Sequence, residues 1–214
     1  MSVESYKGNL FVVSAPSGAG KTSLVKALVS NDDNIGVAVS HTTRKQRPEE
    51  QDGVNYHFTD EAQFNAMVEA GEFLEWARVF DNLYGTSQGA VESVLAEGKH
   101  LVLEIDWQGA EQIRKTLPAA QTIFIFPPSY QALEQRLIAR GQDDDATVER
   151  RMASALEETS HYREFDYLIV NDVFETALAE MSQIVHGDGD QFRRESQLER
   201  LSGLIGDLLP QSKP

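Results

Sequence analysis

The 214-residue chain contains no cysteine. This absence excludes disulfide bonds and thiolate metal ligands, and it gives no reason to expect an oxidising compartment. No apolar run approaches the roughly 18–20 residues that a membrane-spanning helix needs. The first residues, MSVESYKGNL, lack a basic segment followed by a long apolar stretch. We therefore expect no signal peptide and a cytoplasmic location.

Positive charge is also scarce, with 19 Lys and Arg residues against 34 Asp and Glu residues and a formal net charge of −15. Nucleic acids and anionic membranes bind basic surfaces, so we expect neither as a partner. A few arginines that converge on one pocket can still bind a phosphate ligand. The five histidines are scattered, and their spacing predicts no histidine metal site.

Short apolar runs rich in β-forming residues alternate with helical patterns along most of the chain. This alternation is typical of βαβ units around a parallel sheet, so we predict an α/β fold. The predicted strands are Leu10–Ser14, Val37–Ser40, His100–Ile105, Thr122–Phe126 and Tyr167–Val170. The predicted helices are Lys21–Val29, Gly109–Lys115, Ser129–Ala139, Thr147–Tyr162 and Glu175–Val185.

Two regions depart from this alternation. Residues 40–98 mix both kinds of pattern and predict an inserted α+β lobe, with a run at Val54–Phe58, helices at Glu61–Ala70 and Gln88–Ala96, and a strand at Phe73–Phe80. The tail after Gly187 places apolar residues on one helical face. These are Leu198, Leu201, Leu204, Ile205, Leu208 and Leu209. Such a helix either packs on its own chain or forms a surface for self-association.

The stretch VVSAPSGAGKTSLV has the order strand, small-residue turn and helix that a phosphate-binding loop requires. Backbone N–H groups and the helix start would bind phosphate, and Gly18 and Gly20 permit positive φ angles. Lys21 would neutralise the β and γ phosphates, and the Thr22 hydroxyl would bind Mg²⁺. Ala15 stands where the pattern G-x-x-x-x-G-K-[ST] has glycine, which costs little if its φ is negative. The alternative is a glycine-rich turn without a ligand.

A second polar cluster lies in SHTTRKQRPEEQDGVNYHF, within the predicted lobe. Arg44 and Arg47 are three residues apart, with Ser40 and Tyr56 nearby. Guanidinium groups match phosphate oxygens well, and a phenol can add one donor. A solvated basic loop explains the same residues, and the cluster alone does not decide between the two interpretations.

Taken together, several segments resemble guanylate kinases of the bacterial type. They are SAPSGAGKTSL, VSHTTRKQRPEEQDGVNYHF, FLEWARVFDNLYGTS, EIDWQGA, RLIARG and YLIVND, in the order of the family over residues 10–186. The resemblance implies a P-loop core with three layers and a parallel sheet, made of residues 1–39, 99–139 and 165–186. It also implies a GMP-binding lobe at 40–98 and a helical lid at 140–164, which leaves a tail at 187–214 with an amphipathic helix. In that family the Ala15 variant of the loop is familiar.

The activity that the resemblance implies is transfer of the γ-phosphoryl group of ATP to GMP, and to dGMP, with Mg²⁺ as cofactor. ATP would contact Ala15, Pro16, Ser17, Gly18, Ala19, Gly20, Lys21, Thr22 and, through adenine, Asn171. The GMP phosphate would contact Ser40, Arg44, Arg47, Tyr56 and Tyr84. Glu75, Thr86 and Asp106 would face guanine, whose N1–H and N2–H donors suit carboxylates. Adenine has a bare acceptor at N1. Glu75 has a second interpretation, as a solvent-facing strand residue.

The expected catalytic residues neutralise the transferring group and include none that acts as a nucleophile. They are Lys21, Arg44, Arg136, Arg140 and Arg151. Arginines on a solvated helix, paired with Asp143–Asp145 and Glu149, are the alternative for the lid. Glu104 follows a strand at the position where such folds place acids near Mg²⁺, and it either binds the metal directly or orients its ligands.

Two rival functions remain at this point. A kinase for another nucleoside monophosphate would share the fold, and Glu75 and Asp106 argue against it. A non-catalytic peptide-binding domain of guanylate-kinase type would typically have lost the loop lysine or the lid arginines, which this chain keeps.

Overall fold

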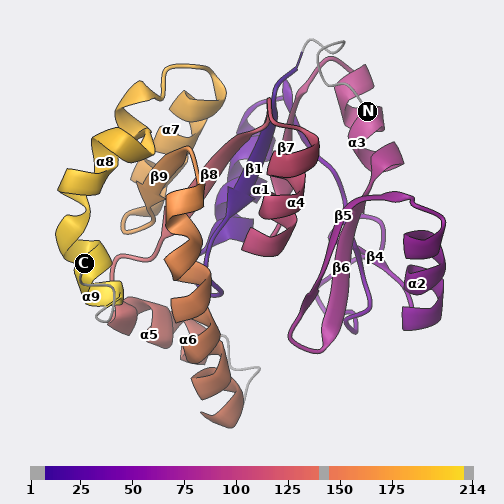
Figure 1. Cartoon of the computed structure of the whole chain (residues 1–214), viewed down its shortest axis with the longest axis horizontal. Helices are drawn as coiled ribbons and strands as arrows, with labels where there is room; N and C mark the ends of the chain where they lie inside the picture. The colour runs from indigo at the N-terminus through magenta and orange to yellow at the C-terminus, as the bar shows by residue number, and fades with distance from the viewer. Residues whose placement is uncertain (1–7, 140–144, 210–214) are drawn as a thin grey trace.

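Two sheets organise the protein in the computed structural model, which describes residues 8–139 and 145–209 (Figure 1). The larger sheet has five parallel strands in the order β2-β7-β1-β8-β9. Their bounds are β1 Leu10–Ser14, β2 Ile35–Val37, β7 His100–Glu104, β8 Gln121–Phe126 and β9 Tyr167–Val170. The predicted parallel sheet is confirmed.

Strand β1 is buried along its whole length, as expected for the centre of a sheet that is covered on both faces. Phe11 and Val13 face a cluster that includes side chains of α1 (Lys21–Asn31) and α7 (Phe174–Val185). Leu10 and Val12 face the opposite cluster, with side chains of α3 (Gln88–Ala96) and α4 (Trp107–Thr116). The core therefore has three layers, as predicted.

The smaller sheet forms the lobe on the right of Figure 1 and has the order β4-β3-β6-β5. Its elements are β3 His41–Thr42, β4 His57–Phe58, α2 Glu61–Glu69, β5 Phe73–Val79 and β6 Asn82–Ser87. Phe64 on α2 stacks on Phe73 with ring centroids 4.5 Å apart, and Leu83 completes this small core. Strand β5 lies at the edge of the sheet, so one of its sides has no neighbouring strand.

Helices α5 (Tyr130–Ala139) and α6 (Asp145–Ser160) form a third unit, and α6 extends below the main sheet in Figure 1. Leu133 and Leu137 on α5 pack with Met152 and Ala155 on α6. The short helix η2 (His161–Glu164) follows. There His161 stacks on Trp107 of α4, with ring centroids 3.6 Å apart and planes 9° from parallel. This stack joins the C-terminal end of α6 to the core.

The tail forms three short helices instead of the single amphipathic helix that we predicted, namely η3 Asp190–Phe192, α8 Arg194–Arg200 and α9 Ser202–Leu208. Leu201, Ile205 and Leu208 are buried in the cluster on the α3 and α4 side of the main sheet. Leu198, Leu204 and Leu209 pack against the same cluster. The apolar face of the tail therefore packs on its own chain.

Two predicted segments have other bounds in the structure, and one strand was not predicted. The strand expected at Val37–Ser40 is β2, which ends at Val37, because the chain then crosses to the lobe, where the Ser40 and Thr86 hydroxyls lie 2.9 Å apart. Only His57–Phe58 of the run Val54–Phe58 is a strand, and Val54 is exposed. Strand β6 was missed because NLYGTS has few apolar residues; its partner β5 supplies the pairing.

Candidate active site

A cleft of about 600 Å³ lies between the turn that follows β1, the lobe and helix α6. Sixteen of the predicted site residues line it: Ala15, Pro16, Ser17, Gly18, Gly20, Lys21, Thr22, Ser40, Arg44, Arg47, Tyr56, Glu75, Tyr84, Glu104, Asp106 and Arg151. Ala19, Thr86, Arg136 and Asn171 are not among the lining residues. Arg140 lies outside the described residues.

The turn after β1 has the backbone of a phosphate-binding loop. Gly18 and Gly20 both have φ of 92°, a region that glycine enters without steric cost. A Cβ atom at Gly20 would lie 2.4 Å from the Asn171 amide nitrogen, so glycine is also required there for space. Among the described residues the only non-glycine with positive φ is Phe80. Ala15 therefore has negative φ, and its methyl group is compatible with the loop.

The charged and hydroxyl groups at the start of α1 have partners at the end of β7. Lys21 Nζ donates to the Ile105 carbonyl oxygen over 2.7 Å, and the Thr22 hydroxyl donates to the Glu104 carboxylate. The Thr22 and Glu104 oxygens are hard donors of the kind that Mg²⁺ prefers. In the described part of the chain, no group of three or more His, Asp or Glu side chains could hold a metal ion.

Asn171 and Arg136 contact the phosphate loop and each other. The Asn171 side chain is buried and donates to the Ala19 carbonyl oxygen over 2.7 Å. Arg136 Nη2 donates to the Asn171 carbonyl oxygen over 3.0 Å. These bonds brace the loop. Neither residue lines the cleft.

The lobe brings its predicted phosphate-binding residues together around Glu50. The Glu50 carboxylate accepts two hydrogen bonds from the Arg44 guanidinium, at 2.7 and 3.0 Å, and one from the Arg47 backbone N–H at 2.8 Å. The guanidinium carbon of Arg44 lies 5.5 Å from the centroid of the Tyr56 ring. The Tyr84 ring also lies beside Tyr56, with ring centroids 5.9 Å apart. Arg44 is thus held in place by a side chain that also lines the cleft.

Two carboxylates line the cleft, Glu75 from strand β5 of the lobe and Asp106 from the turn after β7 of the core. Glu75 on β5 is 3% exposed, and Thr86 donates to it through its hydroxyl and its backbone N–H. Asp106 caps α4, accepting from the Gly109 N–H at 2.9 Å. Burial raises the pKa of Glu75 to about 7, the Thr86 bonds oppose this rise, and the charge of Asp106 adds to it. The buried Glu75 and the half-buried Asp106 are two acceptors in the same cleft as a phosphate loop, and they can read a ligand that carries hydrogen-bond donors.

Residues 7–188 match the family model described as guanylate kinase. A curated guanylate kinase from Alkalilimnicola ehrlichii is 52% identical over 201 residues, which cover 93% of this chain and 99% of the relative. A second, from Saccharophagus degradans, is 55% identical and covers 94% and 98%. This chain belongs to the guanylate kinase family.

The fold agrees with this assignment to the guanylate kinase family. The crystal structure of a guanylate kinase from Anaplasma phagocytophilum matches with a TM-score of 0.72 at 31% identity, covering 92% of this chain and 96% of the other. None of the helices in residues 8–139 and 145–209 has the length and apolar content to cross a membrane.

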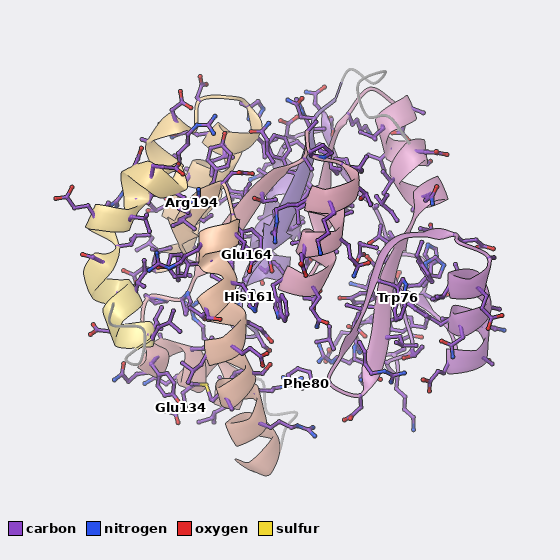
Figure 2. All side chains as sticks on the ribbon, viewed as in Figure 1. Trp76, Phe80, Glu134, His161, Glu164 and Arg194 are labelled. Atoms are coloured by element: carbon purple, nitrogen blue, oxygen red, sulfur yellow. The ribbon has the colours of Figure 1, made fainter. Side chains whose placement is uncertain are left out.

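Several cleft residues of this guanylate kinase-family chain were not predicted from the sequence. Glu158 on α6 accepts from the Ser17 N–H of the phosphate loop at 2.8 Å and from the Ser154 hydroxyl at 3.0 Å. Arg150 lies 3.8 Å from the Asp81 carboxylate and 5.8 Å from the ring centroid of Phe80. Phe80, labelled in Figure 2, is at the tip of the β5–β6 hairpin. Glu158 and Arg150 look like ordinary helix-surface charges in sequence, so no local signal could have found them. Glu50 stood in the quoted polar loop, next to the arginines it binds.

Proposed function

We propose that this protein transfers the γ-phosphoryl group of ATP to GMP, and to dGMP, giving ADP and GDP. The observation that carries the proposal is the pair of carboxylates, the buried Glu75 and the half-buried Asp106, in the same cleft as a phosphate loop. The loop supplies a donor site, and the two carboxylates supply an acceptor site with a preference for a base that donates hydrogen bonds. Guanine does so from N1 and N2, whereas adenine offers an acceptor at N1.

The acceptor phosphate binds beside the lobe arginines. Arg44 and Arg47 present positive charge there, and Ser40, Tyr56 and Tyr84 add hydroxyl groups along the same wall of the cleft. The Arg44–Glu50 contact fixes the guanidinium before the ligand arrives, so less side-chain freedom is lost on binding. Thr86 acts beneath the cleft by donating to Glu75, and its contact with guanine is indirect.

The donor phosphates bind to the backbone N–H groups of residues 15–22, and Lys21 exchanges the Ile105 carbonyl for a phosphate oxygen. Thr22 and Glu104 would hold Mg²⁺ together with phosphate oxygens. When bound, this ion neutralises charge on the phosphates. Arg151 lines the cleft on α6, and with Arg136 and Arg140 it completes our proposed set of catalytic arginines. The arginines stabilise the charge of the transferring group while the GMP phosphate attacks it directly.

The test is a coupled assay of ADP release with GMP, AMP, UMP and CMP as acceptors. We expect GMP to be preferred over AMP by about 10⁴-fold in kcat/KM, because adenine would leave the buried Glu75 carboxylate unpaired. The Lys21→Ala variant is the control, and it should lose almost all turnover while remaining folded by circular dichroism. Comparable use of AMP, or no turnover with any acceptor, would contradict the proposal, and the second result would favour a binding domain.

A further inference from the structure

We propose that helix α4 sets base selectivity by fixing Glu75 relative to Asp106, with Gly109 and Gln112 as the positioning residues. The inference rests on the proposed function, in which these two carboxylates read guanine. The two acids come from different sheets, since Glu75 lies on β5 of the lobe and Asp106 follows β7 of the core. Two hydrogen bonds to one base require that the separation of the two carboxylates is held constant. Contacts between the lobe and the core are therefore needed at this point.

Gly109 is the first positioning residue of α4 and contacts both acids. Its N–H donates to the Asp106 carboxylate at 2.9 Å, which fixes one acid. On its other side, a Cβ atom would lie 2.4 Å from Glu75 Oε2 and 3.2 Å from Glu75 Cδ. Gly109 has no need of glycine for its backbone, because it lies inside α4 and its φ is not positive. Glycine is needed at position 109 because a side chain there would collide with the Glu75 carboxylate.

Gln112 is the second positioning residue and lies about one helical turn after Gly109. Its side-chain amide accepts from the Trp76 backbone N–H at 3.2 Å and donates to the Trp76 carbonyl oxygen at 2.7 Å. Because β5 is an edge strand, these are backbone groups that no strand satisfies, and the amide takes the place of a neighbour. Trp76 directly follows Glu75, and Figure 2 shows it on the lobe. Gln112 therefore fixes the backbone next to the base-reading acid.

The strand is irregular at the same place. The pairing of β5 with β6 shifts register between Phe73 and Glu75. A bulge of this kind redirects a side chain and weakens the ladder that would hold it. The contacts from α4 fix the position of Glu75, which the interrupted β5–β6 pairing holds less firmly. Hydrogen bonds weaken steeply when their alignment is lost, and a misplacement of about 1 Å can lower a rate 10²-fold. The contacts of Gly109 and Gln112 therefore control base selectivity.

The experiment compares Gly109→Ala and Gln112→Ala with the parent, using GMP, IMP and ATP in steady-state kinetics. IMP lacks the N2 amino group of GMP, so the ratio of the two kcat/KM values reports how well the second donor is read. We expect Gly109→Ala to lower kcat/KM for GMP at least tenfold and Gln112→Ala at least threefold. The GMP-over-IMP ratio should narrow in both variants, and KM for ATP should stay within about threefold.

Matched controls separate positioning from general damage. Gly89→Ala is a control because a Cβ atom there has no atom within 4 Å, and Gln183→Ala removes an exposed, hydrogen-bonded glutamine from α7. Neither should change the ratio. Alanine favours a helix over glycine by about 1 kcal/mol, so Gly109→Ala gains in helix propensity, and thermal melting checks its fold. If that variant does not fold, Gln112→Ala carries the test alone.

An unchanged GMP-over-IMP ratio in a folded variant would overturn the inference. Equal losses for GMP, IMP and ATP would also overturn it, because they indicate a purely structural role. These results leave the proposed function intact provided that the parent prefers GMP and Glu75→Gln weakens its use. A parent without GMP preference would instead refute the proposed function.

Discussion

Glu75 is a carboxylate whose protonation state changes near neutral pH. Burial raises its pKa to about 7 from an ordinary value of 4.5, against the effect of two hydrogen bonds from Thr86. Only the ionised carboxylate offers both oxygens as acceptors to guanine, since the protonated form is a donor at one of them. Bound guanine therefore favours the ionised form, whereas the empty site favours the protonated one.

We predict opposite effects of pH on GMP use and on stability. As pH falls from 8 to 6, kcat/KM for GMP should fall because Glu75 becomes protonated at about pH 7. Between pH 4.5 and 7 the folded state of the empty protein holds a proton on Glu75 that the unfolded state has lost. Its free energy of unfolding therefore decreases as pH rises through this window.

The pH–rate profile and thermal denaturation of the parent and Glu75→Gln measure the two effects. The variant should lose the step near pH 7 in its GMP profile and should lose part of the stability slope below it. A parent and a variant with superimposable profiles would show that another group controls the dependence on pH.

Sequence reasoning was strong at single residues with a fixed chemical motif and weak where a partner comes from elsewhere in the chain. Lys21, Thr22 and the two loop glycines follow from a local pattern, and the structure gives the loop the backbone this pattern needs. The bracing role of Asn171 could not be predicted, because its partner Ala19 is 152 residues away. The contact between Gly109 and Glu75 could not be predicted for the same reason, because the two residues are far apart in the sequence.

At the scale of elements, α6 links the phosphate loop to the lobe. Its Glu158 accepts from the Ser17 N–H, and its Arg150 lies against the hairpin tip at Phe80 and Asp81. A carboxylate on a phosphate-loop N–H occupies a donor that a nucleotide phosphate would use. Nucleotide binding at this N–H therefore requires that Glu158 gives up its contact.

We predict that Glu158→Gln binds ADP about three to ten times more tightly than the parent, measured by isothermal titration calorimetry. The neutral amide competes less well for the Ser17 N–H, and the net difference of one hydrogen bond is about 0.5–1.5 kcal/mol. Glu157→Gln, an exposed change one residue away on α6, is the matched control and should leave the affinity unchanged. Equal or weaker ADP binding by Glu158→Gln would show that the contact does not compete with phosphate.

The predictability of the elements follows their hydrophobic patterns. Strands β1, β7, β8 and β9 are continuous apolar runs, which is typical of a sheet buried on both faces, and they were predicted to within one or two residues. Strand β6 has the sequence NLYGTS and gains its stability from pairing with β5, which no local pattern reports. The sequence pattern therefore predicts the element boundaries least well in the lobe.

For the whole molecule, the tail completes the core. Leu201, Ile205 and Leu208 lie more than 180 residues after β1 and share a cluster with its Leu10 and Val12. Burial of an apolar face within one chain leaves little of it for another copy. The periodicity of the leucines predicted the buried face, but the choice between its own chain and a partner needed the three-dimensional arrangement.

We predict that Leu208→Ala lowers the free energy of unfolding by about 2–5 kcal/mol, because Leu208 is 2% exposed and its truncation leaves a cavity. Chemical denaturation measures this loss, and Val173→Ala, at a residue 53% exposed, is the control with little expected change. Light scattering should give the same mass for the parent and Leu208→Ala. A lower mass with unchanged stability would indicate that the tail serves association between copies.

The central claim is that Glu75 reads guanine, and steady-state kinetics of Glu75→Gln on GMP and AMP test it most directly. The amide turns one acceptor into a donor and removes the charge, and a hydrogen bond to a charged group contributes about 1.5–3 kcal/mol. We predict that kcat/KM for GMP falls at least tenfold, that KM for ATP stays within about threefold, and that the preference for GMP over AMP narrows. A variant whose GMP and AMP constants both equal those of the parent would contradict the claim.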